Sequence, residues 1–163
     1  MSTALTTAIY RRLAGLETMT GEGLAAQVAL AALLGTDPDT SEPSVHKGNK
    51  SMIVTYPAIT FRQNAGMVKT EFKDTAIDDP VYDFEIWNST QSATLISDIY
   101  KHVEHLLDER FSMSLGIPPL SVDGNVGQVY YARAFVPLID DLYDKDLRSW
   151  FGLCRMRFVE ARF

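Results

Sequence analysis

Two stretches near the start of the chain repeat apolar residues every three or four positions, the spacing that places them on one side of an α-helix. The first begins behind the possible caps Ser2 and Thr3 and ends near Gly15. The second runs from about Gly23 to Leu34 and is apolar on almost every side. Such a helix is either buried or pressed against a neighbouring chain.

A third stretch with helical spacing gives the strongest helix prediction. A cap at Ser89 or Thr90 precedes it, and the helix should end before Pro118. Its apolar stripe consists of Ile96, Ile99, Tyr100, Val103, Leu106, Leu107 and Phe111.

Five other stretches favour β-strands, because apolar and polar residues alternate in them or strand-forming residues are frequent. Pro57 confines the first strand to a sheet edge or a bulge, and Gly66 marks a hairpin between the first two. Asp78 and Asp79 predict a turn before the third. The approximate bounds of the five are Met52–Arg62, Met67–Phe72, Val81–Trp87, Val126–Leu138 and Ser149–Phe163.

The order of these elements predicts an α+β fold. Residues 1–163 should form a single domain, mainly an antiparallel β-sheet with helices packed on one face. A long polar loop is expected over residues 36–50, and the acidic link Asp140–Asp146 should join the two strands of the C-terminal pair at 126–163. The expected core contact places Ile99, Val103, Leu106 and Leu107 against Tyr82, Phe84 and Ile86.

The charge of the chain narrows the classes of partner. It has 21 acidic and 15 basic side chains, a formal net charge of -6, and its longest basic pairing is Arg11-Arg12. Proteins that bind duplex DNA neutralise phosphates with clustered Lys and Arg, so we expect no specific DNA binding. The apolar run Leu24–Leu34 is too short to span a bilayer, and the N-terminus does not resemble a signal peptide. We therefore expect assembly in a cytoplasm and no membrane partner.

No group of residues predicts catalysis or cofactor binding. His102 and His105 are three residues apart on the third helix and could ligate a metal, but a solvated helix face is the better interpretation. Gly21-Glu22-Gly23 lacks the rest of a nucleotide-binding motif, and no nucleophile elbow occurs. The single cysteine, Cys154, should be a buried, inert thiol. We predict no enzyme, no metal and no cofactor.

Charged residues alternate with the core positions of two strands far apart in the chain. Asp83 and Glu85 lie on one strand, and Arg155 and Arg157 lie on the other. This pattern predicts a second sheet face that carries both signs, either solvated or forming a charged seam between identical subunits. The acids of the link are further candidate interface residues, namely Asp140, Asp141, Asp144 and Asp146.

Several short segments, in this order, resemble a known family. An N-terminal amphipathic helix is followed by a polar loop, a strand that contains Pro57, and a long helix with a Ser/Thr start. The segments are Leu33-Leu34-Gly35, Tyr56-Pro57-Ala58-Ile59-Thr60-Phe61, Ile86-Trp87-Asn88 and Leu106-Leu107. Over residues 1–112 the chain is similar to the tail-terminator (tail-completion) proteins of long-tailed phages, which include the lambda-type minor tail protein U.

This resemblance implies a virion structural protein in the neck region of a phage tail. Six copies would form a ring on the end of the tail tube, stop tube polymerisation and present a surface to the head connector. Genome DNA would pass through the ring without specific binding. The loop at Thr36–Lys50 and the segment Val126–Phe163 are longer than the family pattern. The alternatives are a neck or connector (head-completion) protein of the same particle, and a small enzyme or ligand-binding domain.

Overall fold

The computed structural model describes residues 3–64, 68–72, 75–122 and 128–162, which form an α+β fold as the sequence predicts. Its main sheet has six strands in the order β1-β2-β5-β8-β7-β6. Only β1 and β2 pair in parallel. The strands are β1 (Val45–Lys47), β2 (Ala58–Gln63), β5 (Val81–Asn88), β6 (Leu120–Ser121), β7 (Gln128–Asp144) and β8 (Ser149–Arg162).

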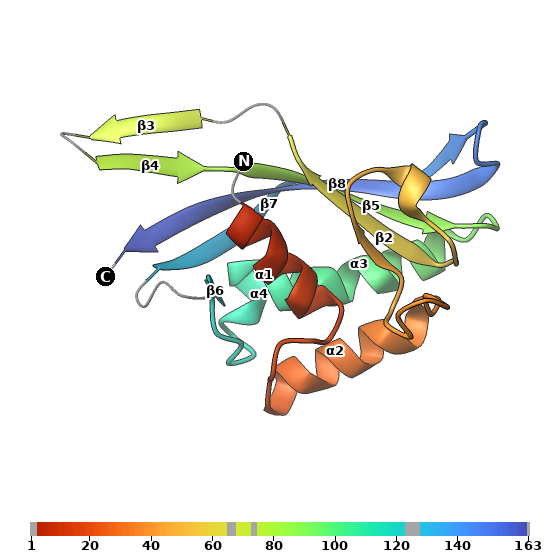
Figure 1. Ribbon diagram of the computed structural model, residues 1–163, viewed down its shortest axis with the longest axis horizontal. Helices are drawn as coiled ribbons and strands as arrows, with labels where there is room; N and C mark the ends of the chain where they lie inside the picture. Colours follow the sequence, from red (N-terminus) through yellow and green to blue (C-terminus); the bar gives the residue numbers. More distant parts are fainter. Residues whose placement is uncertain (1–2, 65–67, 73–74, 123–127, 163) are drawn as a thin grey trace.

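The helices lie on one side of this sheet, below it in Figure 1. The helix α3 and the short α1 are nearer the sheet, and α2 forms the layer farthest from it (Figure 1). Among the described residues, no α-helix covers the opposite face of the sheet. The helices are α1 (Thr3–Leu13), α2 (Gly21–Leu33), α3 (Ala93–Leu107) and α4 (Glu109–Ser112).

The predicted core contact between the third helix and the third predicted strand is confirmed. All seven residues are buried members of one hydrophobic cluster, and Leu106 is fully buried. Aromatic rings line its sheet side: the Tyr82 and Phe158 rings meet edge to face at 5.3 Å between centroids, and Phe61 stacks on Phe84 at 5.7 Å. Such pairs add about 0.5–1.5 kcal/mol beyond the burial of their area.

Gly152 allows α3 and β7 to approach β8 near the start of that strand. A Cβ atom at this position would lie 2.6 Å from Cγ2 of Ile96 and 2.8 Å from Cδ1 of Leu138. Both distances are shorter than a van der Waals contact between carbons, so a side chain here would push helix or strand away.

The ends of the third helix differ from the prediction. Ser92, and not Ser89 or Thr90, is the N-cap, and its hydroxyl accepts a hydrogen bond from the Leu95 N–H. The helix ends at Leu107 and a second short helix, α4, starts after Asp108. Asp108 caps α4 by accepting from the Arg110 N–H, so Phe111, the last residue of the predicted stripe, lies on α4, where it is exposed.

The polar segment over residues 36–50 is only partly the loop that we expected: residues 36–44 lie outside any helix or strand, but a strand and the start of a 3-10 helix follow. Part of it is the edge strand β1, which pairs with β2, and the Gly48 N–H donates to the Phe61 carbonyl. The following residues form the 3-10 helix η1 (Lys50–Met52), which Asn49 caps, so the predicted strand at 52–62 starts only at Ala58. Backbone pairing to a distant strand overrides the polar composition of this segment.

The predicted hairpin between the first two strands is also wrong. The strand β3 (Val68–Phe72) pairs with β4 (Thr75–Asp79), so Asp78 and Asp79 lie in a strand and not in a turn. In Figure 1 this two-stranded ribbon continues outward from the main sheet. Gly66 and Met67 lie outside the described residues.

The acidic link is shorter than predicted because β7 continues to Asp144 and β8 begins at Ser149. Three register shifts interrupt the pairing of β7 with β8, and Asp141 and Arg148 have positive φ angles of 62° and 50°. Bulges of this kind bend a hairpin and increase its twist. Val126 and Phe163, which were predicted to bound these strands, lie outside the described residues.

Candidate interaction surfaces

The face of the main sheet away from the helices, here called the open face, carries the charged residues predicted for it. Tyr82, Phe84 and Ile86 point into the core and are fully buried, so Asp83 and Glu85 between them point the other way. Strand pairing places Asp83 opposite Arg155.

Asp83 and Arg155 are bound to each other within the chain. Arg155 Nε donates to Asp83 Oδ1 at 2.5 Å, and the Nη2 atom donates to Oδ2 at 3.2 Å. The Asn64 amide also donates to this carboxylate at 3.2 Å, and Asp83 is only 8% exposed. This pair is therefore a partly buried intrachain contact, and it does not stand free for a neighbouring subunit.

A groove of 410 Å³ opens at one end of the open face, between the sheet and η1. Its floor is the Trp87 indole, which stacks on Phe151 at 4.4 Å between centroids and donates to Thr60 Oγ1 at 3.1 Å. Thr60 in turn donates to Glu85 at 3.2 Å. In the sequence, Trp87 follows the inward-facing Ile86 of an alternating strand. This outward position was the sequence signal for an aromatic floor of the groove.

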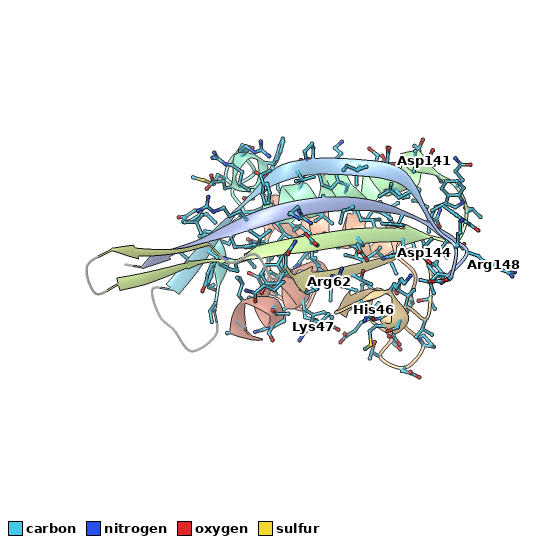
Figure 2. All side chains as sticks on the ribbon, turned by 90° about the horizontal axis from the view of Figure 1, so that it is seen from above. His46, Lys47, Arg62, Asp141, Asp144 and Arg148 are labelled. Carbon is cyan, nitrogen blue, oxygen red and sulfur yellow. The ribbon has the colours of Figure 1, made fainter. Side chains whose placement is uncertain are left out.

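Two cations line the same groove, and sequence reasoning missed both. Lys50 comes from η1 and is joined to Asp144 at the far end of β7, and no local pattern links these two positions. Arg62 is exposed and makes no ion pair with any side chain in the described part of the chain. Figure 2 looks onto this face and labels Arg62 and Asp144.

A second groove, of 370 Å³, lies over β7 and β8 near the start of β7. Arg133 and Arg157 are direct register partners there, and Arg133 is also paired with Glu109 of α4. Tyr131 and Val159 form the next outward pair along the same strands. Arg157 is exposed, so this part of the open face is basic and partly apolar.

The predicted acidic interface residues take different roles. The carboxylate of Asp144 accepts from the N–H groups of Asp146 and Leu147 at 2.9 and 3.0 Å, and the Lys50 hydrogen bond is the main reason that its pKa is lowered. Asp141 accepts from Gln91 at 2.9 Å. Asp140, Asp141 and Asp146 are exposed, whereas Asp144 is half-buried.

The two helix histidines are half-buried, and so are less solvated than the sequence suggested. Their rings are perpendicular with centroids 6.2 Å apart, and the buried Nδ1 of His102 has no hydrogen-bond partner. Burial lowers the pKa of His102, and the neighbouring His105 adds to this effect. Within residues 3–64, 68–72, 75–122 and 128–162, no group of three or more His, Cys, Asp or Glu side chains could hold a metal ion.

The outer side of α2 forms a second surface, on the opposite side of the molecule from the open face (Figure 1). The inner side of the helix is buried, and Gln27 fixes it by donating to the carbonyls of Arg12 and Glu17. The outer side is a row of exposed apolar residues, here called the α2 ridge: Leu24, Ala25, Val28 and Ala32.

No protein-family model matches the chain, and a comparison with curated protein sequences finds no match to it. Among the described residues, no helix has the length and apolar character needed to cross a membrane.

Proposed function

We propose that this protein is a virion structural subunit that forms a ring on the end of a phage tail tube. The observation that carries the proposal is the position of two unlike surfaces on opposite sides of one subunit, the open face and the α2 ridge (Figure 1). A closed ring of identical subunits uses heterologous contacts, in which each copy meets its two neighbours through two different surfaces.

The composition of these surfaces also supports a protein contact. Leu24 and Val28 are 47% and 61% exposed, and apolar side chains in a row on a helix are typical of an interaction site. On the other side, aromatic and arginine side chains lie together in the two grooves, and both residue types are frequent at the centres of interfaces.

The particular ring follows from the resemblance of residues 1–112 to tail-terminator proteins. In this role the ring stops the growth of the tail tube and presents a surface to the head connector, and its partners are further copies of itself, the tail-tube protein and the connector. The net charge of -6 on each chain is consistent with a ring through which DNA passes without binding.

Two measurements test the proposal. Native mass spectrometry of the purified protein should give a closed oligomer, for six copies about six times the 18.2 kDa of one chain, and negative-stain images should show rings. When the protein is added to the tail-tube protein of the same genome, polymerisation should give shorter tubes with a ring at one end. A protein that stays monomeric at high concentration and leaves tube length unchanged does not have this function.

A further inference from the structure

We propose that residues 49–54, here called the η1 strap, form a movable cover over Trp87 and that Lys50 holds this cover closed. The strap consists of Asn49, the 3-10 helix η1 and the two residues that follow it. Its release would uncover an aromatic surface on the open face. The inference concerns a single subunit, so it holds whether or not the subunits form a ring.

Trp87 faces outward from the sheet and is nonetheless buried. Its position in the alternating strand β5 directs it to the open face, where no α-helix among the described residues covers the sheet. Even so, Trp87 is only 1% exposed. Phe151 stacks on the indole from β8, and residues 49–51 of the strap form another part of the same groove wall. The strap therefore belongs to the cover that keeps the indole from solvent.

The chain is fixed by its backbone just before and just after the strap. The Gly48 N–H donates to the Phe61 carbonyl at 2.9 Å. The Pro57 carbonyl accepts from the Gly35 N–H at 2.8 Å. A movement of the strap is therefore confined to a short loop between two anchored points, and the sheet itself does not have to move.

Between these two points the strap is held weakly. None of residues 49–57 is buried, and the backbone hydrogen bonds of the strap are local, such as that from the Met52 N–H to the Asn49 carbonyl at 3.1 Å. Within the described part of the chain, Lys50 alone joins the strap to a distant segment by a hydrogen bond or ion pair. Segments with few buried contacts open at a lower free energy than the core does.

Lys50 reaches from the strap to the end of the β7–β8 hairpin. Its ammonium group is bound to Asp144 and lies 3.6 Å from Oδ2 of Asp146. Asp144, labelled in Figure 2, also accepts from the N–H groups of Asp146 and Leu147, so this acceptor stays in position when the strap opens. The Lys50 side chain is 37% exposed, and salt screens ion pairs that solvent can reach. The contact is therefore a latch that salt should weaken.

The fluorescence of Trp87 measures whether the cover opens. The chain has two tryptophans, so Trp150→Phe leaves Trp87 as the only one and serves as the parent protein. Lys50→Met removes the latch and should raise the rate of quenching by acrylamide, a neutral quencher, at least about twofold. Lys145→Met is the matched control, because it removes the same charge from an exposed position in the turn between β7 and β8. It should be quenched like the parent, and circular dichroism checks that each variant is folded.

Salt gives a second measurement that needs no variant at Lys50. Raising the sodium chloride concentration from about 0.05 M to about 1 M should increase quenching in the parent and in Lys145→Met, since it screens the latch. The same change should leave Lys50→Met unaffected. Three results would overturn the inference: equal quenching of the parent and Lys50→Met, a response to salt that persists without Lys50, or an equal rise in Lys145→Met.

Discussion

Asp83 and Arg155 face each other on neighbouring strands, joined by hydrogen bonds of 2.5 and 3.2 Å on the open face of the sheet. The carboxylate side chain is 11% exposed and the guanidinium side chain 34% exposed. This contact joins β5 to β8, two strands that are distant in the sequence. The charged row predicted from the sequence therefore serves the fold at these two positions.

Removing the cation should destabilise the protein. Arg155→Met leaves the carboxylate of Asp83 nearly buried without its ion pair, at a cost of about 1–3 kcal/mol in the free energy of unfolding. Urea denaturation measures this cost. The double variant Arg155→Met with Asp83→Asn removes the uncompensated charge as well, and should recover part of the loss. A loss below about 0.5 kcal/mol for Arg155→Met would show that the contact is only a surface ion pair.

Truncation of Leu106 should have a larger effect. This side chain is fully buried between α3 and the sheet, so Leu106→Ala should lower the free energy of unfolding by about 2–5 kcal/mol. Leu24→Ala is the matched control, because Leu24 is also on a helix but is 47% exposed, and should change the stability of the monomer by less than about 0.5 kcal/mol. Equal effects at the two positions would contradict the placement of the core.

The stability of the protein should fall in acid because of Asp108. Burial by itself raises the pKa of this carboxyl, but hydrogen bonds from the Arg110 side chain and from the N–H groups of Ala134 and Arg110 outweigh it and hold the pKa below the ordinary 3.8. A carboxyl group whose pKa is lower in the folded than in the unfolded protein stabilises the fold at pH values above the pKa of the unfolded state. This contribution is lost as the pH falls through the pKa of the folded state.

Denaturation midpoints measured from about pH 6 to pH 2 should therefore drop most steeply below about pH 4. Asp108→Asn should flatten this drop, because an amide does not titrate. Asp140→Asn, the same change at an exposed acid, should keep the wild-type dependence on pH. If the Asp108→Asn profile is as steep as that of the wild type, other groups cause the acid sensitivity.

Cys154 should be unreactive while the protein is folded. The residue is fully buried in the core on β8, and burial raises the pKa of its thiol well above the ordinary value of 9.0. Because the thiolate is the reactive form, a thiol reagent such as dithionitrobenzoate should modify the protein only after denaturant unfolds it. Rapid modification of the native protein would show that this part of the sheet opens.

The sequence by itself determined the elements whose residues carry a strong local period. The stripe of α3 and the alternation of Cys154, Met156 and Phe158 on β8 each predict which side is buried, and the structure buries those sides. The reason is physical: helix and strand geometry place residues on a face at fixed spacing, and the core removes the apolar face from water. The class of fold follows from the order of these elements.

Only the tertiary structure decided the features that depend on contacts between residues distant in the sequence. The polar segment at Val45–Lys47 becomes a strand because β2 offers a free edge for its backbone, and β7 extends to Asp144 because β8 pairs with it. The contact between Lys50 and Asp144 likewise needs the chain to return to the same groove. Local sequence patterns record the burial of a residue, but they do not record which distant strand satisfies its backbone or which charge faces its side chain.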